Sequence, residues 1–498
     1  MRPNNTATLY SLIQESCELA PNQLALVDAT RSLTYGELDK AIQDVEKYLL
    51  ELGISDQYPI MIVGENSIAL SVLLLASAKL HVCVVMENAR RVFPEISKII
   101  DHSCPSHIFY LHENSRDAEN HAMHDGAETK SNPALGQFGL KLNSLPNLKP
   151  VPSDVAALIY TTGSTGKPKG VMLTHENLSY IARMMKRYRS VGSDDRVYAI
   201  LPFTHVMGCA SVLLGGLHSG ATLFVRAKFD VAECIECLRK HKITIMQGAP
   251  AMFSKILEYC SVNYISSFKS LRFLAAGGAP LDRSLKSEVF TRLGAQLHNG
   301  YGLTEAASIS WTRMEEASDD DSVGRPLEGV EIVFRDASLN QVNDGRVGEL
   351  WCRGPNLMLG YFDNPELTKS AIDEHGWFNT QDLGYRGPDG RIYIVGRTKE
   401  LIIKSGFNVY PLEIEALLNA HPYVMHSAVI GKAVNGNEEI HAFVEMRTEQ
   451  HNKRDVLAEY LSKNLSPYKR PDQIHVLKSL PLSLNGKVLK SQLASTYL

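Results

Sequence analysis

Tyr160 to Val171, with the sequence YTTGSTGKPKGV, combine the residue types that hold a phosphate group. Glycines let backbone N–H groups approach an anion closely, and hydroxyl and lysine side chains add donors and positive charge. The candidate phosphate ligands are Thr161, Thr162, Gly163, Ser164, Thr165, Gly166, Lys167 and Lys169. The spacing is not that of the GxxxxGK P-loop, because only two residues separate Gly163 from Gly166. A Gly- and Ser-rich surface turn is the alternative interpretation.

A second group, Cys234, Cys237 and His241, has spacing that resembles a zinc site. A fourth ligand and a second CxxC pair are missing, however, and the segment VAECIECLRKH has helical periodicity. We therefore favour a packed helix over a metal site.

The elements that must position the phosphate loop follow an α/β pattern. Helical segments and short apolar runs alternate from Leu9 to about Leu111, which predicts a parallel, doubly wound sheet. The polar segment from Glu113 to Pro152 is predicted to be a mobile surface excursion without chemistry. After the loop, further apolar strands end in Gly, Pro or hydroxyl residues, and their loops should converge on one site.

The last third of the chain changes character twice. Short β runs from Gly324 to Gly396 predict a small β-rich subdomain. An α+β unit follows, so we expect a large N-terminal domain over 1–397 and a small mobile lid domain over 398–498.

Composition narrows the partners. The 498 residues carry a formal net charge of −4 and show no basic block, so neither nucleic acid nor an acidic membrane surface is expected to bind. The most apolar run is interrupted by Lys79 and His81, and no membrane span is expected. Eight scattered cysteines predict no disulfide framework and a cytoplasmic location.

Six motifs in a fixed order give the chain a specific resemblance. They are YTTGSTGKPKGVMLTHENL, YGLTEA, GELWCRGPNLMLGY, NTQDLGY, GRTKELIIKSGFNVYPLEIE and NGKVLK. In order and spacing the chain resembles the acyl-CoA synthetases of the adenylate-forming superfamily over nearly its whole length. The resemblance implies that a carboxylic acid and ATP form an acyl-adenylate and pyrophosphate, after which a thiol accepts the acyl group. ATP, Mg²⁺ and coenzyme A are the implied small molecules.

The resemblance also implies roles for single residues in the first half-reaction. Lys487 matches the family's adenylation lysine, whose ammonium bridges the carboxylate and the α-phosphate. Glu305 would bind Mg²⁺, Thr304 would donate to the α-phosphate, and Tyr301 would offer its ring to adenine. Without the other motifs, a solvated lysine and a core tyrosine would be the simpler interpretations.

Asp382 matches the residue that accepts both ribose hydroxyls, with support from Arg397. The chain departs from the family's usual glycine at Gln381. It departs again at His81 and Met86, where relatives carry small and rigid residues, so the N-terminal sheet is a place to look for different packing.

The second half-reaction implies that the small domain swings about a hinge, which the resemblance places at Lys399. The face that would then meet the thiol consists of Lys404, Ser405, Gly406 and Phe407. A β-hairpin turn is the alternative interpretation of Gly406.

An acyl pocket, mainly apolar and small, is expected around the cleft loops. Its predicted lining is His205, Val206, Met207, Gly208, Gly248, Ala276, Gly277, Gly278 and Leu303. The resemblance makes His205 a gate of this pocket and one of the catalytic residues. No Asp occurs from Phe203 to Phe229, which disfavours a free amino acid because its ammonium would be buried unpaired.

The predicted partner is therefore a small-molecule carboxylic acid, fatty or aryl, joined to coenzyme A. Two alternatives stay open at this point. One is a stand-alone enzyme that loads the acid onto the phosphopantetheine of an acyl-carrier protein. The other, which the retained motif residues disfavour, is a non-catalytic nucleotide- or acyl-binding protein.

Overall fold

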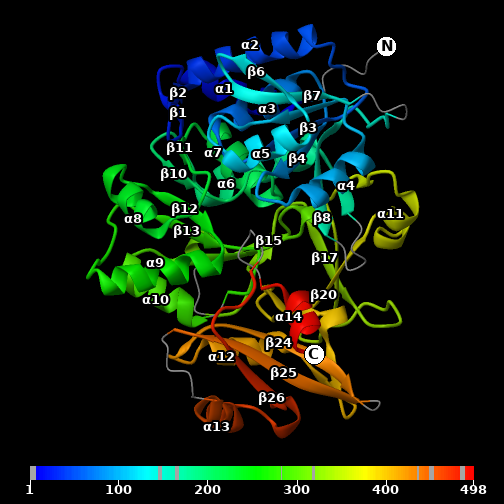
Figure 1. Ribbon diagram of the computed structural model, residues 1–498. Coiled ribbons are helices and arrows are strands. Elements are labelled where there is room, and N and C mark those ends of the chain that lie inside the picture. The colour runs from blue at the N-terminus through cyan, green and yellow to red at the C-terminus, as the bar shows by residue number, and fades with distance from the viewer. Residues whose placement is uncertain are drawn as a thin grey trace.

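The structure is a computed structural model that describes residues 7–143, 148–162, 168–281, 283–316, 320–434, 437–447, 454–482 and 488–498. Two large sheets and a smaller one form the upper part of the molecule in Figure 1, and an α+β unit containing the C-terminus lies below them. The predicted α/β class is confirmed.

The first large sheet has the strand order β16-β15-β14-β13-β12-β10-β11-β1-β2. Its strands are β1 (Leu24–Val27), β2 (Ser32–Thr34), β10 (Arg196–Ala199), β11 (Thr222–Val225), β12 (Ile245–Gly248), β13 (Phe273–Ala276), β14 (Leu297–Tyr301), β15 (Ser310–Trp311) and β16 (Arg325–Pro326). The strands from β1 to β14 in this order run parallel, and β2, β15 and β16 pair antiparallel at the two edges. The carboxyl ends of β12, β13 and β14 therefore meet at one edge of the sheet, where α/β proteins bind their ligands.

The second large sheet has the order β19-β9-β8-β4-β3-β5-β7-β6. Its strands are β3 (Ile60–Gly64), β4 (Val84–Asn88), β5 (His107–Tyr110), β6 (Glu128–Asn132), β7 (Gly136–Leu142), β8 (Val155–Thr162), β9 (Pro168–Thr174) and β19 (Gly360–Tyr361). Met86, one of the two departures noted above, is buried in β4 between β3 and β8. His81 has a left-handed φ of 58° and its ring meets that of His175 edge-on at 5.5 Å.

Helices cover the faces of both sheets. They are α1 (Leu9–Leu19), α2 (Tyr35–Glu51), α3 (Ile68–Lys79), α4 (Phe93–Ser103), α5 (Arg116–His124), α6 (His175–Arg189), α7 (Gly215–His218), α8 (Val231–Lys240), α9 (Pro250–Val262), α10 (Arg283–Leu293) and α11 (Pro365–Ala371). The helix α3 is apolar on all sides and is buried from Ile68 to Ala78, in contact with α1 and α2. None of the helices in the described ranges is both long and apolar enough to cross a bilayer.

The segment from Glu113 to Pro152 corrects the sequence prediction of a mobile excursion. Its described part forms α5 and the hairpin β6/β7, and β7 pairs antiparallel with β5. Phe138 is fully buried, and the Tyr110 hydroxyl donates to Asp125 Oδ2 at 2.6 Å. Polar residues dominate the sequence because β6 is an edge strand with little buried surface.

A four-stranded antiparallel sheet follows, in the order β17-β18-β20-β21, and confirms the predicted β-rich subdomain. Its strands are β17 (Glu331–Arg335), β18 (Gly348–Arg353), β20 (Phe378–Arg386) and β21 (Ile392–Arg397). Short 3₁₀ turns flank these sheets, namely η2 (Thr304–Ala306), η3 (Met314–Glu316) and η4 (Thr398–Glu400).

The C-terminal unit has hydrophobic clusters of its own, formed by residues between Ile402 and Leu493. It contains β22 (Ile402–Lys404), β23 (Phe407–Val409), α12 (Pro411–Asn419), β24 (Val424–Val434), β25 (Asn437–Met446), α13 (Arg454–Asn464), η5 (Pro467–Lys469), β26 (Gln473–Leu477) and α14 (Lys490–Tyr497). Lys490 forms 2.8 Å ion pairs with Glu400 and Glu415, which ties α14 to η4 and α12. The domain boundary at 397/398 stays a prediction.

Two helices at the centre of the molecule position the cavity described below. The helix α6 begins at a capping box, in which Thr174 accepts from the Asn177 N–H and Asn177 accepts from the Thr174 N–H, and it ends at Arg189. The second, η1 (Met207–Leu214), is a π-helix and is buried from Gly208 onward. Such wide turns are rare and are often found at functional sites.

Candidate active site

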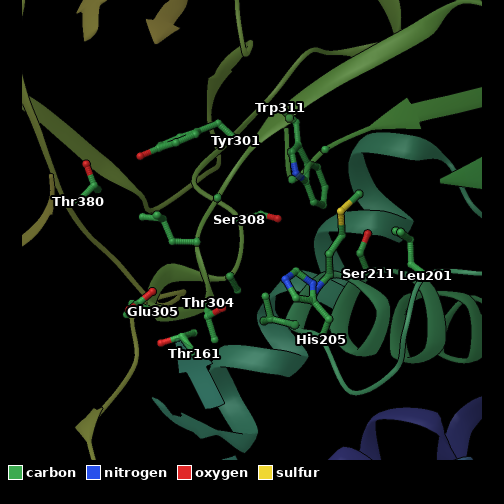
Figure 2. A pocket seen from close by; sticks show the side chains of 18 of the residues that line it. Thr161, Leu201, His205, Ser211, Tyr301, Thr304, Glu305, Ser308, Trp311 and Thr380 are labelled. Carbon is green, nitrogen blue, oxygen red and sulfur yellow. The ribbon is translucent and has the colours of Figure 1, made fainter. Parts of the chain in front are cut away.

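A cavity of about 360 Å³ lies at the carboxyl ends of β12, β13 and β14. Fourteen of the residues predicted from the sequence line it. They are Thr161, Lys169, His205, Val206, Met207, Ala276, Gly277, Gly278, Tyr301, Leu303, Thr304, Glu305, Arg397 and Lys399. Figure 2 shows that most of the labelled side chains gather at two ends, with Ser308 between them. Thr161, Tyr301, Thr304, Glu305 and Thr380 form the hydroxyl-rich end, and Leu201, His205, Ser211 and Trp311 form the aromatic end.

At the hydroxyl-rich end, Tyr301, Asp382 and Arg397 form one linked group. Tyr301, at the end of β14, donates from its hydroxyl to Asp382 Oδ2 at 2.6 Å, and Arg397 Nε lies 3.0 Å from Asp382 Oδ1. The antiparallel register of β20 and β21 sets Asp382 opposite Arg397. Burial and the charge of Asp382 raise the pKa of Tyr301 well above its usual value, so Tyr301 keeps its proton. Asp382 is not itself on the cavity wall but bonds to two residues that are.

Glu305 lies on the 3₁₀ turn η2 beside the same cavity. Its Oε1 accepts from the Tyr361 hydroxyl at 3.0 Å. The Lys169 ammonium lies 5.6 Å from the centroid of the Tyr361 ring, because β19, which carries Tyr361, pairs with β9. Thus Glu305, Tyr361 and Lys169 bring one negative and one positive charge to the cavity wall.

At the aromatic end, His205 is neutral at pH 7. Burial lowers its pKa to about 4, and its Nδ1 accepts a hydrogen bond from the Met207 N–H at 3.4 Å. The proton of the neutral ring is therefore on Nε2, which makes His205 a hydrogen-bond donor rather than a cation.

Three sequence predictions at the cavity need correction or comment. Gly208 is absent from the cavity wall because its backbone packs on Pro202, where a Cβ would lie 2.0 Å from the carbonyl oxygen. Gly248 is also absent, since the space beside it is occupied by Met252 and Phe253. Gln381, by contrast, lines the cavity.

The backbone of Gln381 has a left-handed φ of 58°, a conformation that favours glycine, and its N–H donates to Asn379 Oδ1 at 2.8 Å. The departure from the family's glycine therefore places a polar side chain at the hydroxyl-rich end.

The residues expected to face the thiol are not at the cavity in this structure. Lys404, Ser405, Gly406 and Phe407 form the tip of the hairpin β22/β23. Ser405 and Gly406 have φ values of 52° and 82°, as a two-residue hairpin turn with positive φ at both positions requires. The hairpin alternative is thus confirmed for Gly406. Lys404 is ion-paired with Asp472 at 2.7 Å.

Part of the predicted site lies outside the described residues. This applies to Gly163, Ser164, Thr165, Gly166, Lys167 and Lys487, and to the side chain of Thr162. Of the phosphate-loop residues, the structure places Thr161 and Lys169, which face each other as partners in the β8/β9 ladder. The zinc-like group is described: Cys234 and Cys237 are buried in α8, as the helical interpretation predicted.

The sequence analysis missed most of the aromatic end. Its further lining residues are Met185, Arg189, Leu201, Ser211, Gln247, Phe273 and Trp311. The prediction of a mainly small and apolar pocket therefore missed these larger and polar residues, which lie in α6, in η1, in the strands β12, β13 and β15 and, for Leu201, just after β10. The available signal was Gln247, the one polar residue in the buried four-residue strand IMQG.

Comparison with known proteins gives matches over nearly the whole chain. A family model described as "AMP-binding enzyme" matches residues 13–362, and one described as "AMP-binding enzyme C-terminal domain" matches residues 413–487. The relative named 4-coumarate–CoA ligase 5 from Oryza sativa subsp. japonica is 30% identical, over 97% of this chain and 94% of its own. Peroxisomal OPC-8:0-CoA ligase 1 from Arabidopsis thaliana is 29% identical, over 99% of this chain and 93% of its own.

A solved structure shares the fold. ATP-bound MatB from Rhodopseudomonas palustris superimposes with a TM-score of 0.86, covers 99% of both chains and has 26% sequence identity to this one. The large N-terminal part and the small C-terminal part are thus arranged as in that protein.

Proposed function

This chain belongs to the AMP-binding enzyme family, the adenylate-forming enzymes, and we propose that it joins a fatty or aryl carboxylic acid to coenzyme A. As an AMP-forming acyl-CoA synthetase it uses ATP and coenzyme A. The carboxylate attacks the α-phosphate of ATP, and pyrophosphate leaves with the electrons of the broken P–O bond. The thiol of coenzyme A then attacks the acyl carbon of the adenylate, loses its proton and releases AMP.

The observation that supports the assignment most strongly is the convergence of distant motifs on one cavity. Thr161, Tyr301, Glu305, Arg397 and Lys399 come from separate parts of the sequence and all line it. We assign the hydroxyl-rich end to ATP. Thr161, Lys169 and the neighbouring loop hold the phosphates, and Thr304 donates to the α-phosphate.

The linked group of Tyr301, Asp382 and Arg397 is assigned to the nucleoside. The Tyr301 ring forms a wall for adenine, and the Asp382 carboxylate accepts the ribose hydroxyls.

Glu305 fits a role in binding Mg²⁺. Its carboxylate faces the cavity, and among the described residues only the Tyr361 hydroxyl donates to it. Mg²⁺ prefers one or two carboxylates together with phosphate oxygens. When bound, the ion neutralises charge on the triphosphate. The protein groups do the rest: Lys487 brings the carboxylate to the α-phosphate, and the wall around His205 excludes water.

The aromatic end is assigned to the acyl group. Met185, Leu201, Phe273 and Trp311 give it the width and the apolar surface for an alkyl chain or an aromatic ring. Relatives named as ligases of 4-coumarate and of OPC-8:0 support these two classes of acid. We assign His205 to gating this end, where its Nε2–H is a hydrogen-bond donor. The resemblance also implies a catalytic role, but burial lowers the pKa of His205 to about 4, which makes it a poor proton acceptor at neutral pH.

The thiol step is assigned to a second arrangement of the C-terminal unit. Lys399 lines the cavity now, whereas the hairpin tip at Lys404 to Phe407 does not. A rotation about Lys399 that exchanges Lys487 for this hairpin tip would bring both to the same acyl carbon in turn.

The test is pyrophosphate release from ATP and Mg²⁺ across a panel of fatty, aryl and dicarboxylic acids, with and without coenzyme A. Multiple turnovers that require coenzyme A with at least one acid class support the proposal. A single equivalent of pyrophosphate with coenzyme A inert would instead assign the carrier-protein alternative. The cytoplasmic location stays a prediction, and one relative is named as peroxisomal.

A further inference from the structure

Arg189 is a buried cation at the aromatic end of the cavity. It is the last residue of α6 and is only 2% exposed, yet it lines the cavity. Its guanidinium lies between two rings, 4.8 Å from the centroid of Phe273 and 5.2 Å from that of Trp311. Both are cation–π contacts, so neither ring supplies a hydrogen-bond acceptor to the guanidinium N–H groups.

The hydrogen bonding of Arg189 is incomplete. Its Nη1 donates to the carbonyl oxygen of Thr312, and within the described residues no other acceptor and no carboxylate lies within bonding distance. A guanidinium has five N–H donors in its plane, so most of them are without a partner. Other arginines of the sheet region differ, because Arg272 is paired with Asp195 and Arg226 with Glu233.

The charge of Arg189 persists in this site. Burial lowers its pKa to about 9, which is still above neutral pH. His298 lies nearby and does not compensate, since burial and the charges of Arg189 and Lys286 lower its pKa to about 3 and leave it neutral. The exposed carboxylate of Glu315 attracts Arg189 electrostatically, but among the described residues no carboxylate forms an ion pair with it. A buried charge without an ion-pair partner is costly, which indicates that the partner arrives with a ligand.

A second donor lies along the same wall. The Ser211 hydroxyl donates to Gln247 Oε1 at 2.9 Å, and this bond orients the carboxamide so that its NH₂ group is the free end. Among the described residues the NH₂ group has no acceptor, and Gln247 lines the cavity. Gln247 pairs with Ala275 on the neighbouring strand β13. Ala275 is two residues from Phe273, which contacts Arg189, so Gln247 lies between Arg189 and the carboxyl ends of the strands.

We propose that the acid activated by this enzyme carries a second carboxylate at its far end, which binds to Arg189 deep in the aromatic end with Gln247 as a further donor. The inference rests on the proposed function and specifies its substrate class as a dicarboxylic acid. The in-plane N–H groups of the guanidinium match the two oxygens of a carboxylate, and the apolar walls hold the carbon chain or ring between the two carboxylates.

The geometry also favours a long acid. Phe273, which stacks on Arg189, and Gly277, which lines the cavity beyond the end of β13, are four residues apart. At about 3.3 Å per residue the two positions are about 13 Å apart. With the reacting carboxylate assigned to the cavity beside Gly277, the two carboxylates are separated by several carbon atoms or a ring.

The experiment compares matched pairs of acids with the intact protein. Each α,ω-dicarboxylic acid from three to twelve carbons is paired with the monocarboxylic acid of equal length, and cinnamate is paired with 4-carboxycinnamate. Pyrophosphate release with ATP, Mg²⁺ and coenzyme A gives kcat and KM for each. In the best pair we expect kcat/KM to be about 10²-fold higher for the diacid. The apolar end of the matched monocarboxylic acid would leave the buried Arg189 cation unpaired, which disfavours its binding.

The variant Arg189→Met tests the residue itself. We expect it to lower kcat/KM for the best diacid by about 10²-fold, mostly through KM, to raise kcat/KM for the monoacid because the unpaired cation is gone, and to leave KM for ATP within about threefold. Arg189→Lys should restore part of the diacid preference. Arg187→Met is the matched control on the same helix, since Arg187 is exposed and paired with Glu328, and it should behave as wild type.

Two results would overturn the inference, and a third would overturn the proposed function itself. One is a higher kcat/KM of the wild-type enzyme for the monoacid in every pair. This comparison needs no variant, so it remains decisive even if Arg189→Met does not fold. Another is an equal loss for both acids in Arg189→Met and Arg189→Lys, which would make Arg189 purely structural. If no acid of either class is turned over, the proposed function itself has failed, whereas turnover of monoacids alone rejects only the dicarboxylate.

Discussion

The two ends of the cavity differ in how their charged groups are satisfied. At the hydroxyl-rich end, Asp382 already bonds to Tyr301 and Arg397, and Glu305 bonds to Tyr361. At the aromatic end, Arg189 has one carbonyl acceptor among the described residues and no ion-pair partner. The first end is organised before any ligand binds, while the second lacks a group that only a ligand would supply.

This difference separates common chemistry from individual specificity. The interlocked groups at the hydroxyl-rich end are assigned to ATP, which is the same co-substrate whichever acid is activated. The incomplete end selects the acid, because the energetic cost of leaving Arg189 unpaired falls on every ligand without an anionic terminus. Four further variants break or sharpen this comparison.

The largest effect is expected at the reaction centre. Lys487→Ala should lower adenylation by about 10³-fold, since it would remove the cation that we assign to neutralising both reacting anions. Thioester formation from supplied acyl-adenylate should change by only a few-fold. Pyrophosphate exchange and coenzyme A acylation measure the two steps separately, and an equal loss in both would show that the two half-reactions do not use different residues.

Breaking the interlocked group should have the next largest effect. Asp382→Asn removes the charge that pairs with Arg397 and accepts from Tyr301, and it should raise KM for ATP by about 10²-fold. The preference among acids should not change. Asp389→Asn, a surface substitution in the same sheet region, is the control. A changed ranking of acids in Asp382→Asn would mean that the two ends are not independent.

The pH dependence of stability should report on His205. Its pKa falls from about 6.5 unfolded to about 4 folded, so between these values the unfolded state binds more protons and stability decreases as pH falls. By pH 5 this group alone should cost about 2 kcal/mol. Urea unfolding at pH 7, 6 and 5 measures the loss, and His205→Asn should reduce it by that amount. Parallel pH profiles for variant and wild type would contradict the assignment of this pKa.

The smallest effect is expected at Gln381. A left-handed backbone costs a residue with a Cβ about 1 kcal/mol. Glycine avoids this cost but has more conformational entropy to lose on folding, so Gln381→Gly should raise the free energy of unfolding by a net of about 0.5 kcal/mol. Gln381→Ala keeps the Cβ and should not stabilise. The midpoints of urea unfolding compare the two, and equal midpoints would remove the strain argument.

Most of the hydroxyl-rich end could be predicted from the sequence, since its residues stand in short contiguous motifs such as YGLTEA and NTQDLGY. The aromatic end could not be predicted in this way. Arg189 looks like an ordinary basic residue in the last turn of a helix, where cations are common, and its burial depends on Phe273 and Trp311, which are far away in sequence.

Dependence on contacts with residues far away in sequence also explains why the segment from Glu113 to Pro152 was predicted wrongly. The strand β7 buries only three consecutive residues, without a regular alternation, and β6 is polar throughout because one edge of the sheet faces solvent. Only the pairing with β5, a long-range contact, turns this polar segment into structure.

The π-helix η1 sets a limit on how this pocket can be altered by changing chain length. Its wide turns place Met207 and Ser211 on the cavity wall, with Ser211 held against Gln247. Deleting one residue between Met207 and Leu214 would allow the turn to tighten to an α-helix, and each residue beyond the deletion would rotate by about 100°. Ser211 would then release Gln247, so insertions and deletions at this segment should be far less tolerated than substitutions, and a library of pocket variants should keep its length constant.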